Sequence, residues 1–353
     1  MRWSLFIAVS AAALHYIHTS YYELVPGNAT AVVANVQGPQ VTTYPPRHHI
    51  AMVDIVLTQL SLGRYLYAHL GGHVEYYPES WLLPPNGSVE DFTRQGYIDM
   101  AMAKDSASYV ALTRAGYSTS RRAAGALVYE IAPHSPFERS HIRVGDRLTA
   151  INGLPIHGSC DLIRATHSLL PGTRIALKVQ AAHISGAGVV TYGAEDVHYL
   201  AMVRHRGDYS TDCPGARSQP KAALGVSLAN SVAYSLPASV TIPTKYVGGP
   251  SGGLAMTLAI LDRLSPTSLA GHHRVAVTGT ISDNGAVGTI GGIAEKTTAA
   301  INKHFDVFIV PKRQVGEARR ADQGKIRIIG VANIDQALRA LQRLSGSTVP
   351  QGH

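Results

Sequence analysis

The residues best suited to chemistry stand in a glycine-rich loop ahead of an apolar helix. Ser251 lies in the run Gly249-Pro250-Ser251-Gly252-Gly253, and the residues that follow predict a buried helix over 254–264. Glycines let a backbone approach a ligand closely, and the N–H groups at a helix start favour a developing negative charge. This setting suits a nucleophilic serine, with a serine that merely caps a tight turn as the alternative. ATP or GTP hydrolysis is not expected, because no P-loop motif occurs.

A nucleophilic serine needs a base, and Lys296 is the candidate. It stands among small and apolar residues near the start of the helix predicted over 293–303. Burial disfavours the charged ammonium, so the pKa of this lysine should fall toward the working pH. A lysine whose amine reaches the surface is the alternative reading. Thr278, in the run Val277-Thr-Gly-Thr-Ile281, is placed to hydrogen-bond the amine and orient it.

The chain from about residue 225 to 345 resembles the Ser-Lys proteolytic domain of the Lon peptidase family. The similarity rests on these segments in order: the loop around Ser251, Thr278–Ile281, Gly285-x-Val287-x-x-Ile290-Gly-Gly, Glu295-Lys296 and the strand Val307–Pro311. The resemblance implies that Ser251 is the nucleophile, Lys296 the general base and Thr278 the residue that orients it. It also implies an oxyanion site along the backbone loop of Gly249, Pro250 and Gly252.

Two residues and one missing module depart from that family. Gly252 stands where the family usually has alanine, and Gly248 stands where ATP-dependent members carry an acidic residue. The ATPase module has no counterpart in the sequence. The resemblance therefore implies a peptidase that works without ATP-driven unfolding.

Residues 123–180 look like a compact module similar to PDZ domains of the bacterial protease type. The similarity rests on the segments Ala126–Ile131, Ser135-Pro136, Gly145–Leu148 and Ile151-Asn-Gly153. A groove between the strand over 126–131 and the helix over 159–170 would take a peptide as an added strand. Gly125, Ala126, Leu127 and Val128 are the expected peptide-binding residues. A packing module without a ligand is the alternative.

The N-terminus predicts an export segment. Arg2 precedes the apolar run Trp3–Leu14, and the first acidic residue is Glu23. A basic start and a short apolar run are typical of such segments. An uncleaved anchor with an interfacial belt of Tyr16, Tyr21 and Tyr22 is favoured over a signal cleaved near Ala11–Ala13, and a buried core helix is the third reading.

The composition limits the classes of protein to which this chain can belong. The chain has 353 residues, of which 45% are hydrophobic and 15% charged, which excludes wholesale disorder and allows two or three domains. The net charge of +8 is not clustered, so nucleic acid is not an expected partner. Cys160 and Cys213 form no CxxC pair, which argues against a zinc ribbon. Two unrelated buried thiols are favoured over a disulfide, and neither a metal nor a cofactor is expected.

The pattern along the chain predicts an α+β fold. Strands are expected at 31–36, 125–131, 145–151, 175–179, 240–242, 274–281, 305–310 and 326–329, and further helices at 89–116 and 334–344, with a strand passing into a helix over 51–70 and a loop over 71–92. The expected division is a signal anchor over 1–22, an N-terminal segment over 23–120 that packs on the protease domain, a PDZ-like domain over 121–205 and a Lon-type proteolytic domain over 221–346. The PDZ-like module would then be an insertion.

Anchor, PDZ-like module and Lon-type domain together resemble the small membrane-anchored peptidases that combine these parts. The resemblance implies an exported, ATP-independent serine endopeptidase that cleaves unfolded polypeptides or peptides, with the PDZ-like module selecting substrate or partner chains. The expected location is the cell membrane, single-pass with the bulk extracytoplasmic, or secretion after signal cleavage. A homo-oligomer is left open. The alternative function is a non-catalytic peptide-binding adaptor on a degenerate peptidase scaffold.

Overall fold

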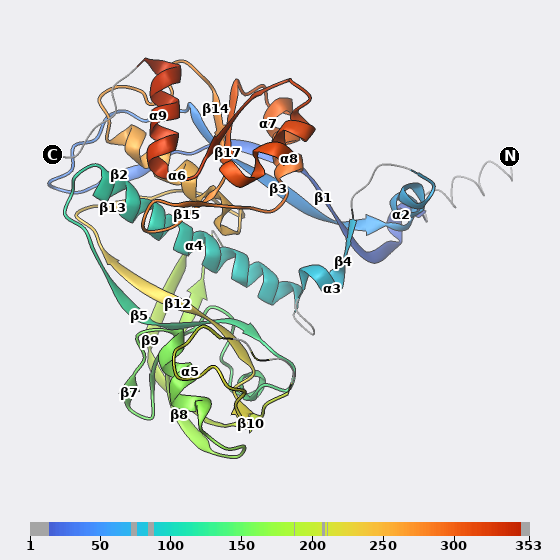
Figure 1. Cartoon of the computed structure of the whole chain (residues 1–353), viewed down its shortest axis with the longest axis vertical. Coiled ribbons are helices and arrows are strands. Elements are labelled where there is room, and N and C mark those ends of the chain that lie inside the picture. Colours follow the sequence, from blue (N-terminus) through green and yellow to red (C-terminus); the bar gives the residue numbers. More distant parts are fainter. Residues whose placement is uncertain are drawn as a thin grey trace, which may run out of the picture.

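The computed structural model describes residues 14–71, 76–83, 88–186, 188–206, 209 and 211–346. Figure 1 shows a body that contains the C-terminal third of the chain, a β-rich module below it, and the long helix α4 (Val89–Arg114) between the two. The helix predicted over 89–116 is therefore confirmed. A ribbon of two strands extends from the body to one side as an arm that carries helix α2 (Leu62–His69) at its end.

One mixed sheet forms the centre of the body. Its strands lie in the order β18 (Arg327–Val331), β17 (Val307–Pro311), β14 (Val275–Val277), β3 (Ile50–Ser61), β1 (His18–Ala31) and β4 (Tyr76–Pro78). The first four strands are parallel, and β1 pairs antiparallel with both β3 and β4. Two strands from the N-terminal segment thus complete the sheet that the C-terminal strands begin.

Helices cover both faces of this sheet because its strands alternate apolar side chains between the faces. Val275 and Val277 pack with α4, α6 (Gly253–Arg263) and α9 (Ile334–Ser345). Ala276 and Phe308 pack on the other face with α7 (Ile293–Asn302) and α8 (Val315–Asp322). Helix α6 is buried along almost its whole length, as its apolar sequence predicts.

The β-rich module is built on a second sheet. Its strands lie in the order β12 (Val226–Ser235), β5 (Ser120–Ile131), β6 (Arg147–Ile151), β8 (Arg174–Ile184) and β9 (Val190–Ala201), and β7 (Leu154–Pro155) forms a hairpin with β6. Helix α5 (Ser159–His167) covers this sheet, and Phe137, Leu148 and Leu162 form part of its core. The chain enters through β5 and leaves through β12, and the two pair over almost their whole length.

Short elements complete the fold. They are α3 (Glu79–Leu82), β2 (Asn35–Gln37), which pairs with β13 (Ser239–Thr241), β10 (Val203–Arg204), which pairs with β11 (Ala222–Ala223), β15 (Thr280–Ile281), which pairs with β16 (Val287–Gly288), and the 3₁₀ turns η1 (Pro136–Arg139), η2 (Pro250–Gly252) and η3 (Lys312–Gln314). The strand predicted over 274–281 is broken into β14 and β15, because Gly279 takes a φ of +142° between them.

Cys160 and Cys213 form a disulfide, so the expectation of two unrelated thiols is wrong. Cys160 lies in the first turn of α5, and the loop that follows β10 brings Cys213 against this helix. The same loop also places the hydroxyl of Ser218 at 3.0 Å from Nε2 of His167 at the other end of α5. The sequence left this pairing as the less favoured alternative, because three strands and a long loop lie between the two cysteines before the chain returns to α5.

Residues 1–13, most of the predicted anchor over 1–22, lie outside the described residues. The last residues of that span, His18–Tyr22, lie in β1, and the ring of Tyr21 stacks on Tyr65 with centroids 5.1 Å apart. Tyr16 is 75% exposed and Tyr21 and Tyr22 are half-buried, and the predicted interfacial belt of these three residues stays a prediction. In the part of the chain that the structure describes, no helix has the length and apolar character needed to cross a bilayer.

Candidate active site

Ser251 occupies η2, immediately before α6. Gly249, which precedes this turn, has a φ of +85°, a conformation that glycine adopts without strain. A Cβ on Gly253 would come within 2.9 Å of the backbone nitrogen of Ile281. The glycines on either side of Pro250-Ser251 are therefore needed for the turn itself and for its close fit against β15.

Lys296 reaches Ser251 from the first turns of α7. Its Nζ lies 2.7 Å from the Oγ of Ser251, and its side chain is buried, with 2% of the residue exposed. Burial lowers the pKa of Lys296 to about 8, and the carboxylate of Asp54 opposes this shift by favouring the ammonium. The structure thus brings together the two residues that the sequence assigns as nucleophile and base.

Thr278 lies at the end of β14 and contacts both of them. Its Oγ1 is 3.5 Å from the Nζ of Lys296 and donates a hydrogen bond to the carbonyl oxygen of Ser251 at 3.3 Å. The N–H of Gly279 donates to the same carbonyl at 2.9 Å. Thr278 is fully buried, so the break between β14 and β15 fixes a hydroxyl beside the amine.

The backbone groups near Ser251 do not all remain available for an oxyanion. The N–H of Gly249 donates to the carbonyl of Gly96 in α4 at 2.7 Å, and Pro250 has no N–H. Ser251 and Gly252 both lie within the 3₁₀ turn η2, so their N–H groups are the backbone donors nearest the nucleophile in sequence. Of the expected loop residues, Gly249 uses its N–H on Gly96 and Pro250 has none, so the oxyanion role stays a prediction for Gly252 alone.

Two further residues of this site, Asp54 and Gly96, were missed from the sequence, and a third, Gly248, was noted only as a departure from the family. Asp54 on β3 faces Lys296, and Gly96 and Gly248 let the backbones of α4 and the serine loop meet. A Cβ on Gly248 would come within 3.1 Å of the backbone of Gly96. A carboxylate inside the apolar run Ala51–Leu57 was the one available signal for Asp54.

The structure corrects the expected peptide-binding strand of the module. Gly125, Ala126, Leu127 and Val128 lie in β5, which is hydrogen-bonded to β12 on one side and to β6 or the loop before it on the other. No edge is left there for an added strand. The edge strand beside α5 is β12, which the sequence did not predict.

A cavity of about 400 Å³ lies between the start of α5 and the two strands β5 and β12. It is lined by Arg121, Arg122, Ala123, His157, Gly158, Cys160, Asp161, Asn230, Ser231 and Val232. Asn230 of β12 accepts hydrogen bonds from the N–H and the hydroxyl of Ser159, at 2.8 and 3.0 Å. These bonds fix the start of α5 against the edge strand.

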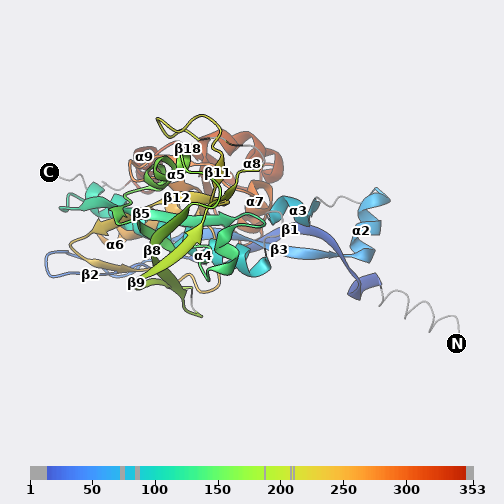
Figure 2. The ribbon, with the colours of Figure 1, turned by 90° about the horizontal axis from the view of Figure 1, so that it is seen from below.

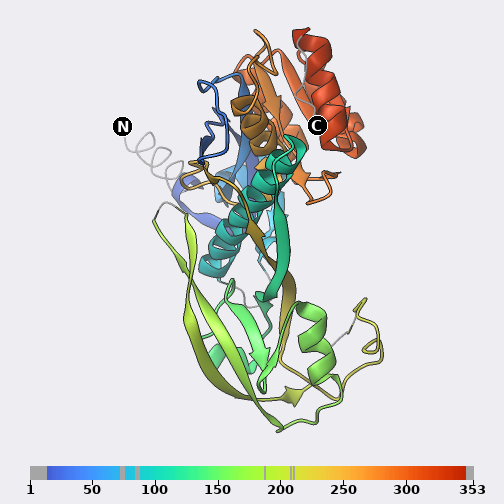
Figure 3. The same ribbon diagram turned by 90° about the vertical axis from the view of Figure 1, so that its left-hand side faces the viewer.

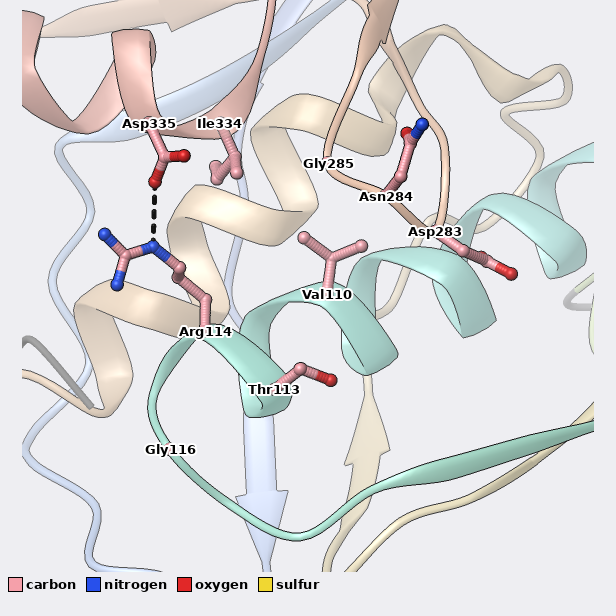
Figure 4. Close-up of a pocket in the computed structure, with 9 residues that line it drawn as sticks. All are labelled: Val110, Thr113, Arg114, Gly116, Asp283, Asn284, Gly285, Ile334 and Asp335. Atoms are coloured by element: carbon pink, nitrogen blue, oxygen red, sulfur yellow. Dashed lines mark hydrogen bonds and ion pairs between the residues drawn. The ribbon is translucent and has the colours of Figure 1, made fainter. Parts of the chain in front are cut away.

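A second cavity, of about 390 Å³, lies where α4 meets α9 and the loop before β16. Figure 4 shows Arg114 paired with Asp335 across it, at 2.9 Å. Asp283 at its rim pairs with Arg121 of β5 and accepts a hydrogen bond from Tyr234 of β12 at 2.8 Å. Ser251, Thr278 and Lys296 do not line this cavity, which marks the junction of body and module. Among the described residues, no group of acidic, histidine or cysteine side chains is arranged to hold a metal ion.

Comparisons with known proteins find two domain matches in this chain. Residues 235–343 match the Lon protease (S16) C-terminal proteolytic domain, and residues 99–183 match the PDZ domain. Lon protease of Clostridium acetobutylicum is 38% identical over 93 residues, which are 26% of this chain and 12% of that protein. Lon protease of Trichlorobacter lovleyi is 34% identical over 107 residues, 30% of this chain and 13% of that protein.

The chain thus spans only about an eighth of the length of these relatives, 12% and 13%. Among solved structures, a PDZ domain of an SdrC-like protein from Listeria monocytogenes aligns with a TM-score of 0.22 at 14% identity, over 30% of this chain and 87% of that one. That likeness is too slight to bear on the fold. The sequence matches identify a Lon-type serine-peptidase domain at residues 235–343 and a PDZ domain before it.

Proposed function

We propose that this chain is a serine endopeptidase that uses Ser251 as its nucleophile and Lys296 as its general base. The observation that carries the proposal is the 2.7 Å approach of a buried lysine amine to the serine hydroxyl. In its neutral form the amine accepts the serine proton as Oγ attacks the carbonyl carbon of the substrate. The amine then returns the proton to the leaving nitrogen, and water hydrolyses the acyl-enzyme by the same route.

The surrounding groups support each part of this cycle. Thr278 lies within 3.5 Å of the amine and would orient it, and the backbone N–H groups of Ser251 and Gly252 are the proposed donors to the oxyanion. Because the pKa of Lys296 is about 8, roughly a tenth of the molecules hold the neutral amine at pH 7, and most hold it above pH 8. Activity therefore rises with pH across this range.

The substrates we propose are unfolded polypeptides, loose tails and short peptides. The choice is supported by the sequence, whose 353 residues contain no P-loop to drive the unfolding of a substrate. We further propose export with membrane anchoring by the N-terminal apolar run. Two observations support export: the apolar residues Trp3–Leu14 follow a basic residue, and the Cys160–Cys213 disulfide is of a kind that persists in oxidising compartments.

For the PDZ domain we propose that substrate or partner chains add along the edge of β12, facing α5. An extended peptide binds an open sheet edge through its main chain and places side chains in neighbouring pockets. The cavity beside Asn230 and Val232 supplies such a pocket at one end of this edge.

The peptidase proposal is tested by incubating the protein with an unfolded protein substrate, without ATP, beside Ser251→Ala and Lys296→Ala. We expect cleavage by the wild type only. Absence of cleavage by all three proteins at several pH values would favour the peptide-binding adaptor instead. Equal cleavage by all three would reveal a contaminating protease.

The PDZ proposal is tested by filling the cavity with Ala123→Trp. Cleavage of an unfolded protein should fall while cleavage of a short peptide, which needs no presentation, stays unchanged. Leu154→Trp is the matched control, since Leu154 is 65% exposed on β7 and lies outside the cavity. If the two variants behave alike, the proposal that chains bind along the edge of β12 is wrong.

A further inference from the structure

The end of the arm is a folded unit with its own small aromatic core. Figures 1 and 2 both show β1 and β3 leaving the body and carrying α2 at their far end. There the ring of Tyr21 stacks on Tyr65 at 5.1 Å and meets Tyr76 edge-on at 5.3 Å. Arg64 of α2 pairs with the buried Glu23 of β1 at 2.9 Å. The inner face of α2 is therefore fixed against the two strands.

The outer face of α2 is apolar, although it packs against nothing that the structure describes. Leu66, Tyr67 and Leu70 are 43%, 57% and 87% exposed, and their spacing puts them side by side on one face of the helix. Tyr65 and His69, which lie on the opposite face, contact the ring of Tyr76. A helix on the surface of a soluble domain normally turns polar residues outward, so this face requires an apolar partner.

The N-terminal end of the described chain joins the same surface. The N–H of Leu62 donates to the carbonyl of Ile17 at 2.7 Å, and a Cβ on Gly63 would lie 3.3 Å from the carbonyl oxygen of Leu14. Tyr16 and Ile17, exposed at 75% and 51%, extend the apolar surface. The residues just upstream, Trp3–Ala13, contain no charged side chain.

We propose that this arm-end surface, formed by Leu14, Tyr16, Ile17, Leu66, Tyr67 and Leu70, lies in the interface of a lipid bilayer. The inference rests on the proposed anchoring, and it adds a membrane contact made by folded residues. A bilayer is favoured over a second protein copy because the apolar residues Trp3–Ala13, the proposed anchor, directly precede this surface in the chain. Tyrosines beside leucines also suit the boundary between headgroups and acyl chains. The arm would then hold the peptidase body at a fixed orientation to the membrane.

The test uses the full chain with a single tryptophan as a depth probe. The protein has two tryptophans, so Trp3→Phe with Trp81→Phe gives a background without any. Tyr67→Trp then places the probe on the arm end, and Tyr199→Trp is the matched control on β9, where Tyr199 is 78% exposed. Each protein is mixed with phosphatidylcholine vesicles whose acyl chains carry bromine, which quenches tryptophan at close range.

We expect quenching at position 67 to exceed that at position 199 several-fold, with a shift of the emission at 67 to shorter wavelength. If the protein sediments with vesicles but the two probes are quenched alike, the arm-end contact is wrong and the anchoring stands. If the protein does not sediment with vesicles, the anchoring proposal itself fails, and this one with it. A shift at 67 without vesicles that grows with protein concentration would show that a second copy covers the surface.

Discussion

Helix α4 meets the peptidase body and the PDZ module through contacts of opposite character. Toward the body, the carbonyl of Gly96 accepts the N–H of Gly249, and backbone lies against backbone. Toward the module, which Figure 3 shows below the helix, the guanidinium of Arg94 donates to the carbonyls of Val144 and Ala182 and pairs with Asp146 at 3.3 Å. These two residues are two positions apart on one helix.

The difference predicts how the contacts on each side of α4 respond to substitution. A backbone contact between glycines has no side chain that can adjust, so the serine loop keeps one position relative to α4. A guanidinium on a long side chain can adjust to small changes in its partners, so we expect this contact to tolerate substitution better than the glycine contact does. Catalytic geometry should therefore respond sharply to changes on the body side, and the module should respond in stability and substrate presentation.

The largest effect is expected at the buried base. Lys296→Met should lower the rate of cleavage by about 10³-fold or more, because it removes the amine that lies 2.7 Å from the hydroxyl of Ser251. The same change should raise the free energy of unfolding at pH 7 by on the order of 3 kcal/mol, since it removes the cost of burying an ammonium. Denaturant unfolding and cleavage assays on one preparation measure both.

The sign of the stability effect depends on pH. Below pH 8 both folded and unfolded chains carry the proton on Lys296, so the wild type bears the full cost of burial. Between about 8 and the ordinary value of 10.5 the folded protein loses its proton first, and the cost fades. The gain of Lys296→Met should therefore shrink as pH rises. A gain that is constant across this range would mean that the lysine charge is not its cause.

The next effect concerns the module alone. Replacing Cys160 and Cys213 by serine opens a loop of 53 residues and should destabilise the module by about 3–4 kcal/mol. Cleavage of a short peptide should stay within twofold of the wild type, because the dyad lies on the other side of α4. Peptide cleavage that fell with the disulfide would show that the body depends on the module more closely than the contacts suggest.

A smaller effect is expected where α4 touches the serine loop. Gly248→Ala places a Cβ within 3.1 Å of the Gly96 backbone and should shift Ser251 enough to cost about 10²-fold in activity. Gly291→Ala is the matched control, since a Cβ there meets nothing within 4 Å. The measurement is kcat and KM for a short peptide, taken for both variants and the wild type. Full activity of Gly248→Ala would sink the claim that this contact positions the nucleophile.

The smallest effect is a shift of the pH profile. Asp54→Asn removes the charge that favours the ammonium of Lys296, so the pKa of the lysine should fall further and the rise of activity should move to lower pH. The maximal rate should change little. The measurement is kcat/KM across the range from pH 6 to 9.5, with wild type alongside. A profile that moves to higher pH would contradict the sign of this interaction.

The chemistry of the body could be predicted because its signals are local. Ser251, Thr278 and Lys296 each stand in a short motif, and the helices and strands that carry them have apolar patterns that predict α6, β14 and α7. The fold explains why Gly248 stands where ATP-dependent members of the family carry an acidic residue. A side chain at this position would meet the backbone of α4. The contribution of Asp54 depends on the pairing of β3 with β14, which joins residues far apart in sequence.

The module could be predicted only in part, because its edge is decided by long-range pairing. The strand pattern over Gly125–Ile131 was read correctly as β5, but whether a strand lies inside or at the edge depends on what pairs with it. Here β12, which comes late in the chain, pairs with β5 and leaves β5 inside the sheet. The disulfide was ranked below two unrelated thiols because it depends on a loop that returns to α5. Helix α8 was missed because it lies in the strongly polar stretch Val315–Asp322.

The central claim, that a buried neutral lysine activates Ser251, is tested most directly by covalent labelling. The protein and Lys296→Met are exposed to a serine-reactive fluorophosphonate at a series of pH values, and the modified residue is identified by mass spectrometry. We predict modification at Ser251 in the wild type, with a rate that rises with pH and levels off above about 8, and almost none in the variant. Labelling of Ser251 at the same rate in both proteins would contradict the account.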